Sequence, residues 1–338
     1  MNGSDLDLDR DVLRDSFGRT IADLRISVTD RCNYKCFYCK TGLGLKAVPR
    51  SRLLTYEEIE RLARIFLGMG IRKLRVTGGE PLLRKDLDNL IGRLAALPGL
   101  EDLALTTNGF SLSSKAGLLK RAGLNRVTVS LDSLDRERFR EMTGQDDLDR
   151  VLEGIRVAQQ EGLEPVKINC VVVRDWNDDE LCRFTDLARE RNLHVRFIEF
   201  MPLDEDEKWT RAQVVTGNEI IERINREHRL IPLKPGRASD TALNYGFRDV
   251  SGTIGVITTV SRPFCGECSR IRLTADGRLR TCLFSLVEHD VKSLLRSGAD
   301  DAAIRNFIRA TVQHKEAGHR INEPDFRPPS RTMSYIGG

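Results

Sequence analysis

The chain has 338 residues, a formal net charge of +4 and a pI of about 8.6. Its length allows one large or two modest domains. The small positive net charge suits anionic small molecules at least as well as nucleic acid, so we expect no nucleic-acid partner. The N-terminus has no signal-peptide pattern and no apolar run reaches membrane-spanning length, so we expect a cytoplasmic protein with no membrane partner.

Residues 1–23 are polar and acidic, and we interpret them as an N-terminal arm. From residue 24 to residue 202, short β-like runs alternate with amphipathic segments. The predicted strands are 24–29, 72–77, 102–107, 125–131, 165–173 and 194–200. The predicted helices lie near 55–69, 86–97, 113–122, 147–162 and 177–192. Six strand-plus-helix steps predict a parallel α/β architecture, either an open barrel or a doubly wound sheet.

Three cysteines, Cys32, Cys36 and Cys39, follow the first predicted strand. Their spacing can place three thiolates around one inorganic centre, but no nearby Cys or His completes the four ligands of a structural zinc site. Soft thiolate ligands suit an iron–sulfur cluster in which one iron has no protein ligand. The alternative is a set of buried or disulfide-forming cysteines.

This stretch resembles the loop of the radical S-adenosylmethionine (SAM) enzymes, Cys-x-x-x-Cys-x-x-Cys, with an aromatic residue, Tyr38, before the last Cys. The resemblance implies that the open iron binds the amino and carboxylate groups of SAM. It also implies that SAM cleavage releases a 5′-deoxyadenosyl radical, which removes a hydrogen atom from the substrate.

Polar side chains recur at every second position of several predicted strands, which places them on one face of the sheet. The cations among them are Arg25, Lys73, Arg75, Lys167 and Arg196. A single such cation is usually a solvated strand end or a surface ion pair. Recurrence at the strand period instead favours a barrel open enough to hold a ligand, with an anionic and often phosphorylated substrate.

The stretch Gly78-Gly79-Glu80-Pro81 follows the second strand, where a plain turn is the alternative to a ligand contact. It resembles the radical SAM motif that contacts the amino group of SAM. Thr106-Thr107-Asn108-Gly109 and Ser130-Leu131-Asp132-Ser133 close the third and fourth strands, at the edge where parallel α/β barrels bind ligands.

The β/α rhythm stops after residue 202, and we interpret residues 203–338 as a smaller C-terminal region with a helix near 217–228. This region contains Cys265 and Cys268, then a Thr-Ala-Asp-Gly hairpin that returns the chain to Cys282. Three thiolates again lack a fourth protein ligand, and a zinc ribbon would need another Cys or His.

With both cysteine groups placed, the chain resembles the molybdenum-cofactor biosynthesis protein A family, the GTP 3′,8-cyclases, from about Phe17 to the terminal Gly-Gly. The resemblance implies an incomplete (βα)6 TIM-type barrel over residues 24–202 that carries a [4Fe–4S] cluster and SAM. It implies a second [4Fe–4S] cluster in the C-terminal region, whose open iron binds the guanine base of GTP.

The resemblance also assigns individual residues. It implies that Cys32, Cys36 and Cys39 ligate the SAM cluster and that Cys265, Cys268 and Cys282 ligate the substrate cluster. SAM contacts are implied for Tyr38, Gly79, Ser130 and Met201. GTP contacts are implied for Arg25, Arg75, Thr106, Lys167, Arg270 and Arg272, with Lys73 and Arg196 added for the triphosphate. Gly337 and Gly338 are expected to enter the site and support catalysis, although a frayed terminus is the usual alternative.

The implied reaction converts GTP into (8S)-3′,8-cyclo-7,8-dihydroguanosine 5′-triphosphate, beginning with abstraction of the ribose 3′ hydrogen. The family resemblance implies an external one-electron reductant, a homodimer, and transfer of the product to a cyclic pyranopterin monophosphate synthase. Two departures from the family pattern are Lys40-Thr41 after Cys39 and Ser269 after Cys268.

Two other functions compete with this interpretation. The first is a peptide-modifying radical SAM enzyme, whose C-terminal domain usually needs more cysteines than the three present here. The second is a zinc-dependent nucleic-acid-binding module, which would contain zinc instead of iron and would bind DNA or RNA in a salt-dependent manner.

Overall fold

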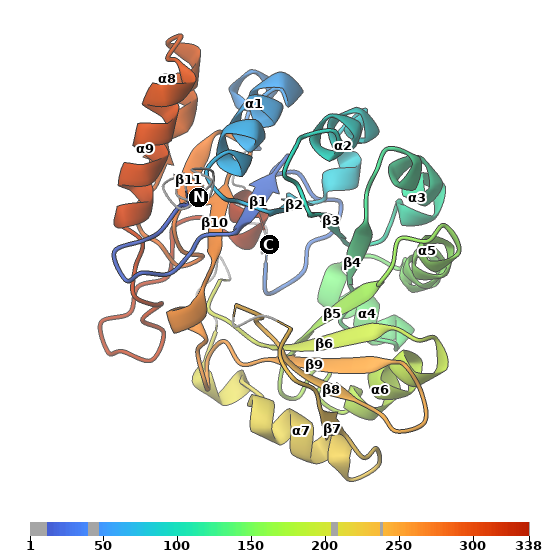
Figure 1. Ribbon diagram of the computed structural model, residues 1–338. Helices are drawn as coiled ribbons and strands as arrows, with labels where there is room; N and C mark the ends of the chain where they lie inside the picture. Colours follow the sequence, from blue (N-terminus) through green and yellow to red (C-terminus); the bar gives the residue numbers. More distant parts are fainter. Residues whose placement is uncertain (1–11, 40–46, 204–208, 237–238, 338) are drawn as a thin grey trace, which may run out of the picture.

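The computed structural model describes residues 12–39, 47–203, 209–236 and 239–337 (Figure 1). Lys40, Thr41 and Gly338, for which the sequence raised expectations, lie outside the described residues. Within the described ranges, no helix combines the length and the apolar character that crossing a membrane requires.

A curved sheet of twelve strands organises the described part of the chain, in the order β12-β11-β10-β1-β2-β3-β4-β5-β6-β9-β8-β7. Its centre consists of six neighbouring parallel strands. These are β1 (Asp23–Ser27), β2 (Lys73–Thr77), β3 (Asp102–Thr107), β4 (Arg126–Ser130), β5 (Lys167–Val172) and β6 (His194–Glu199). The predicted partial barrel is therefore confirmed, and every predicted strand overlaps an observed one.

Helices cover the outer, convex side of these strands (Figure 1). They are α1 (Tyr56–Leu67), α2 (Leu87–Ala95), α3 (Leu112–Arg121), α5 (Leu148–Gln160) and α6 (Leu181–Glu190). Thr55 begins α1 with a reciprocal capping box to Glu58, which satisfies two backbone amides. The sequence analysis missed α4 (Arg136–Thr143), whose buried residues include Phe139 and Met142, because it is short and mostly charged.

The core lies between the strands and these helices. Leu24, Ile26 and Val28 alternate with the polar positions of the first strand and are fully buried. Ile168 and Val172 do the same on β5. Burying one face in this way fixes the register, because a shift by one residue would expose every apolar side chain of the strand.

The chain after residue 202 adds strands to both edges of the same sheet. On β6 it adds β9 (Thr253–Ile257), β8 (Leu243–Gly246) and β7 (Ile231–Pro232), and on β1 it adds β10 (Arg270–Leu273), β11 (Arg278–Arg280) and β12 (His289–Asp290). Its helices are α7 (Gly217–Asn225), α8 (Val291–Arg296), α9 (Asp301–Gln313) and α10 (Met333–Ile336). Single-turn 3₁₀ helices occur at Arg50–Arg52, Pro81–Leu83, Arg211–Gln213 and Cys265–Glu267. Because β10 pairs with β1, the second cysteine group lies beside the first strand of the barrel.

Residues 12–22, the described part of the predicted arm, pack onto the barrel. The backbone amide of Leu13 donates to Met69 O (2.9 Å) and that of Ile21 donates to Leu13 O (2.8 Å). The side chains of Leu13 and Ile21 are buried. This segment therefore contributes to the core before the first strand begins.

Candidate active site

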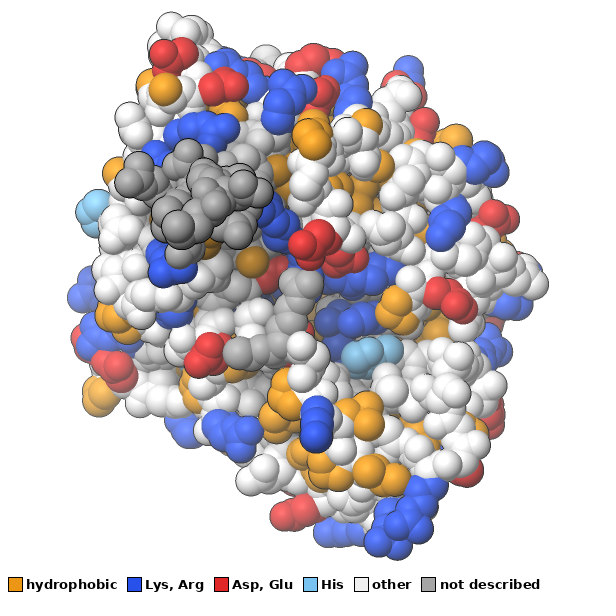
Figure 2. Space-filling model, viewed as in Figure 1, with side chains coloured by type: hydrophobic (Ala, Val, Ile, Leu, Met, Phe, Trp, Pro, Cys, Tyr) orange, Lys and Arg blue, Asp and Glu red, His pale blue; other side chains and the backbone are white. Residues whose placement is uncertain are grey.

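One cavity lies inside the partial barrel, between the central strands and the C-terminal region. Most predicted site residues line it, namely Cys32, Cys36, Cys39, Cys265, Cys268, Cys282, Tyr38, Gly79, Ser130, Met201, Arg25, Arg75, Thr106, Arg196, Arg270 and Arg272. Lys73 and Lys167 line a smaller cavity that shares Arg25, Arg75, Arg196 and Arg270 with the first. Lys and Arg side chains gather in the central hollow of the face shown in Figure 2. The fold thus brings together cysteines that are more than 200 residues apart in the sequence.

The loop of the first cysteine group is held by the end of α4. The backbone amide of Lys35 donates to Thr143 O (2.9 Å) and that of Phe37 donates to Met142 O (3.2 Å). Burial raises the pKa of the Cys36 thiol, and the neighbouring Asp132 carboxylate raises it further. Three thiolates at this place need cationic iron to offset their charge, so the donor set fits an iron–sulfur cluster.

Tyr38 and Asp132 link this loop to the strands on its far side. The Tyr38 hydroxyl donates to the Asp132 carboxylate, whose other oxygen accepts from the Val171 amide (2.8 Å). Burial raises the pKa of Asp132 to about 6. The sequence placed Asp132 at the ligand-binding edge but carried no signal for this pairing, since residues 38 and 132 are distant in the sequence.

The Gly-Gly-Glu-Pro stretch packs directly on the chain that leads into the cysteine loop. The Gly79 amide donates to Thr29 O (2.7 Å), and a Cβ atom on Gly79 would lie 2.4 Å from Arg31 O. Glu80 is buried and accepts hydrogen bonds from Thr107 Oγ1 (2.8 Å) and the Asn108 amide (2.7 Å). Burial raises the pKa of Glu80 to about 7. Glycine is therefore required by this close backbone approach, and Glu80 joins the ends of β2 and β3.

The cations of the polar face are crowded and mostly buried. Arg75 donates to Thr106 Oγ1 (3.3 Å) and Thr128 Oγ1 (3.1 Å). Burial, followed by the repulsion of neighbouring cations, lowers the pKa of Lys167 to about 7 and that of Arg196 to about 9. This arrangement is electrostatically unfavourable without a counter-ion, which makes it suited to a polyanionic ligand.

Arg126 also lines the smaller cavity, although the sequence analysis did not select it. Its guanidinium forms a two-point ion pair with Asp102 (2.8 and 2.5 Å). Its charge is thus largely compensated within the protein by this ion pair.

The second cysteine group is built as predicted, with Cys265 in a 3₁₀ turn and Cys282 brought back by the β10–β11 hairpin. The Cys268 amide donates to Cys265 O (3.2 Å). Burial raises the pKa of the Cys268 thiol, but Arg270 and Lys315 lower it more, to about 6. Ser269 is buried and its hydroxyl donates to the Asp23 carboxylate, so this departure from the family pattern has a partner on β1.

Arg19 supports the second group from outside the cavity. Its guanidinium pairs with Asp15 (2.6 Å) and donates to the carbonyl oxygens of Cys265 (2.7 Å) and Ala317 (2.9 Å). A single arginine in a polar segment carries no recognisable signal, so the sequence analysis did not select it.

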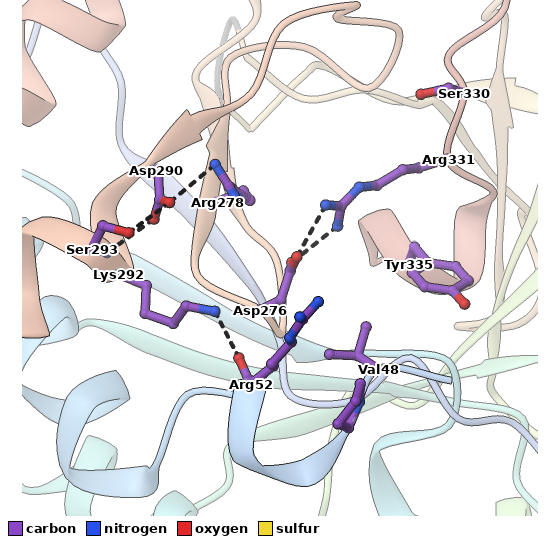
Figure 3. Close-up of a pocket in the computed structure, with 11 residues that line it drawn as sticks. Val48, Arg52, Asp276, Arg278, Asp290, Lys292, Ser293, Ser330, Arg331 and Tyr335 are labelled. Atoms are coloured by element: carbon purple, nitrogen blue, oxygen red, sulfur yellow. Dashed lines mark hydrogen bonds and ion pairs between the residues drawn. The ribbon is translucent and has the colours of Figure 1, made fainter. Parts of the chain in front are cut away.

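The described part of the C-terminal segment contacts the cavity, which Met333 and Ser334 line. Arg272 Nη1 donates to Gly337 O, and Gly337 adopts a φ of +85°. Upstream, Arg331 forms a two-point ion pair with Asp276 (2.9 and 3.0 Å) at the wall of a neighbouring pocket that Tyr335 also lines (Figure 3). The tail is thus fixed at two places, Arg331 and Gly337.

The partial barrel and its three-cysteine loop define a radical SAM enzyme. Residues 26–188 match the Radical SAM superfamily, and residues 193–321 match Molybdenum Cofactor Synthesis C. The crystal structure of Streptococcus suis SuiB bound to S-adenosylmethionine has a similar fold, with a TM-score of 0.60 over 93% of this chain and 77% of that chain at 16% sequence identity. Membership of this class implies one [4Fe–4S] cluster and SAM.

More similar relatives narrow the assignment. The chain is 44% identical to the GTP 3′,8-cyclase of Rhodopirellula baltica, covering 96% of this chain and 92% of the relative. It is 40% identical to the mitochondrial GTP 3′,8-cyclase of Arabidopsis thaliana, covering 97% of this chain and 84% of the relative. The chain belongs to the GTP 3′,8-cyclases, the enzymes of molybdenum-cofactor biosynthesis that the sequence analysis named.

Proposed function

We propose that this enzyme binds GTP between two [4Fe–4S] clusters and converts it into (8S)-3′,8-cyclo-7,8-dihydroguanosine 5′-triphosphate. Cys32, Cys36 and Cys39 hold the cluster that binds SAM. Tyr38, Gly79, Ser130 and Met201 contact SAM. The second cluster is held by Cys265, Cys268 and Cys282 and receives the guanine base.

The observation that supports this proposal is the shared lining of the two cavities. Both cysteine groups face the larger cavity, and four arginines of its wall continue into the smaller one, where Lys73 and Lys167 lie. A nucleotide whose base lies at the second cysteine group can therefore extend its phosphates to the cations. Phosphate oxygens match arginine forks and lysine point charges.

When bound, the SAM cluster supplies the electron that cleaves SAM and so produces the radical that abstracts the ribose 3′ hydrogen. The residues of this chain orient the substrate and exclude water from the reacting atoms. Thr106 and Thr128 fix the guanidinium of Arg75 through their hydroxyl groups. Arg272 holds Gly337 at the inner end of the tail, where it supports catalysis, and we extend this role to Gly338.

Further parts of the proposal follow from the family. The electron comes from an external one-electron reductant, the enzyme is a homodimer, and the product passes to a cyclic pyranopterin monophosphate synthase. Residues 24–202 form the radical SAM unit and residues 203–338 form the unit with the second cluster.

Anaerobic iron and sulfide analysis, followed by assays with SAM and GTP, tests the proposal. We expect two clusters per chain, and we expect Cys265→Ala to retain reductive SAM cleavage while losing formation of the cyclised nucleotide. Cys182→Ala is the matched control, because Cys182 lies on α6 and outside the cavity lining.

Several outcomes would contradict the proposal. Equal loss of both activities in Cys265→Ala would remove the proposed division between the two cysteine groups. SAM cleavage without GTP consumption would favour another radical SAM reaction. Zinc in place of iron would favour the nucleic-acid-binding alternative.

A further inference from the structure

Lys315 is a buried lysine two residues beyond the end of α9, and the proposed function assigns it no role. The residue is only 4% exposed. Its backbone amide donates to Val312 O (2.9 Å), so the end of α9 fixes its position. A buried ammonium group is costly unless it has hydrogen-bond acceptors and nearby negative charge, so its burial calls for a functional explanation.

The Lys315 ammonium joins the two chain segments that carry Cys268 and Cys282. Nζ donates to Arg270 O (3.0 Å), two residues after Cys268, and to Thr281 O (2.5 Å), one residue before Cys282. These are carbonyl groups at the start of β10 and just beyond the end of β11. One side chain therefore holds both segments at the point where their thiols enter the cavity.

Within the described residues, backbone carbonyl oxygens, and not a side chain, hold the Lys315 ammonium. Among the residues that the structure describes, no carboxylate forms an ion pair with Lys315. Its acceptors are carbonyl groups close to Cys268 and Cys282 in the chain, so the thiolates of the proposed second cluster would bring the negative charge that a buried ammonium needs. The Glu316 carboxylate accepts a hydrogen bond from Thr281 Oγ1 (2.7 Å), so it is bound to the same segment.

The residues that follow Lys315 contact the remaining cysteine. Glu316 O and Ala317 O accept hydrogen bonds from Arg19, which also binds Cys265 O. A Cβ atom on Gly318 would lie 3.0 Å from Cys265 Cβ. Residues 315–318 thus contact every segment that carries a cysteine of the second group, and Lys315 brings a positive charge to two of these segments.

We infer that Lys315 is a positioning residue for the second cluster, whose ammonium holds the Cys268 and Cys282 segments together and stabilises the reduced form of that cluster. The inference rests on the proposed second cluster. Reduction adds negative charge to a centre that its thiolates already make anionic, and a fixed cation in a poorly solvated site favours the added electron. Removing the charge will therefore make the reduction potential of this cluster more negative.

The test compares Lys315→Met, which removes the charge at similar length, with Lys315→Arg, which keeps it. Lys120→Met is the control, because Lys120 Nζ donates to Gly162 O (2.5 Å) at the exposed end of α3. After anaerobic reconstitution, iron and sulfide per chain are measured, and each cluster is titrated with EPR detection. The cluster of the first cysteine group is the internal reference.

We expect Lys315→Met to shift only the second cluster to a more negative potential, or to lose that cluster alone, while Lys315→Arg and Lys120→Met retain both clusters. Two assembled clusters with unchanged potentials in Lys315→Met would overturn the inference. The inference would also be overturned if both Lys315 variants lost the second cluster while their circular dichroism spectra stayed unchanged. The cluster would then depend on the shape of the lysine side chain and not on its charge.

The wild-type protein separates this inference from the proposal on which it rests. A single cluster in the wild-type protein would refute the second cluster and, with it, the role of Lys315. Two clusters in the wild-type protein with a Lys315→Met variant that behaves like Lys120→Met would refute the role of Lys315 alone.

Discussion

Arg272 on β10 donates a hydrogen bond to the carbonyl oxygen of Gly337, and this contact links the chain just after Cys268 to the C-terminal tail. Both partners are buried. Burial lowers the pKa of Arg272 to about 9, yet its guanidinium remains charged at neutral pH. The Arg272 side chain therefore both holds the tail and contributes positive charge to the substrate cavity.

Gly337→Ala is expected to displace the tail. Gly337 has a φ of +85°, and an added Cβ would lie 2.6 Å from Thr77 Oγ1 and 2.9 Å from Ser27 Cβ. We expect the rate of GTP cyclisation to fall about 100-fold, as small misplacements in an active site commonly cause, while SAM binding and iron content persist. Activity assays, SAM binding and iron analysis measure these effects.

Gly298→Ala is the matched control for backbone strain. Gly298 also has a φ of +85°, but no atom lies within 4 Å of the position that an added Cβ would occupy. If both variants lost activity equally, the left-handed backbone and not the contact with β1 and β2 would explain the effect.

Affinity for GTP is expected to fall as the pH rises through about 7, because the pKa of Lys167 is lowered to about 7 in the ligand-free protein, first by burial and then by Arg196. A bound triphosphate favours the charged form, so binding above this pH requires uptake of a proton. The loss approaches about tenfold per pH unit above about pH 7, until the pKa of the bound form is reached. Equilibrium binding of GTP, measured over about one pH unit on either side of this pKa, tests the expectation.

Lys167→Arg should remove this pH dependence, because arginine stays protonated throughout the range. The same lowered pKa predicts that the free energy of unfolding of the ligand-free protein rises with pH between about 7 and 10.5, since the unfolded state then binds more protons at this group. A wild-type affinity that is independent of pH would show that Lys167 does not act on the phosphates.

Arg19→Met should remove the second cluster and also destabilise the fold. The Asp15 side chain is 0% exposed and loses its ion-pair partner, which costs about 3–5 kcal/mol for a buried pair. The carbonyl oxygen of Cys265 loses its donor at the same time. Chemical denaturation and iron content report the two effects separately.

The double variant Asp15→Asn with Arg19→Met distinguishes the two effects. Neutralising Asp15 removes the uncompensated charge, so most of the free energy of unfolding should return while the iron content stays near one cluster per chain. Recovery of both clusters in the double variant would mean that Arg19 serves only the stability of the fold.

The central strands and the cavity-lining cations could be predicted from the sequence because both depend on local periodicity. Leu24 and Arg25 alternate in burial as their spacing requires, and the cysteine spacings are visible without any structure. The contacts of Arg19, Asp132 and Lys315 could not be predicted, because each joins segments that meet only when the sheet is complete. The β10 strand illustrates this, since it pairs in parallel with β1 across more than 200 residues of chain.

Arg331→Met is expected to release the tail without unfolding the protein. Arg331 pairs with Asp276 at two points and with Glu288 Oε2 (3.0 Å), and its side chain is 25% exposed, so water can replace part of what these pairs contribute to global stability. Their effect is local, because they hold the chain just before α10. We expect cyclisation to fall at least about tenfold through misplacement of Gly337, with SAM cleavage retained.

Arg278→Met is the control from the same pocket wall, because Arg278 pairs with Asp290 (3.1 Å) and forms no ion pair with the described part of the tail (Figure 3). Hydrogen–deuterium exchange gives a readout that does not depend on activity. The Gly337 amide, which donates to Met333 O (2.9 Å), should exchange faster in Arg331→Met than in Arg278→Met. Release of the tail must expose this amide. If the amide exchanged equally fast in the two variants and Arg331→Met still lost cyclisation, Arg331 would act in the pocket itself and not through the tail.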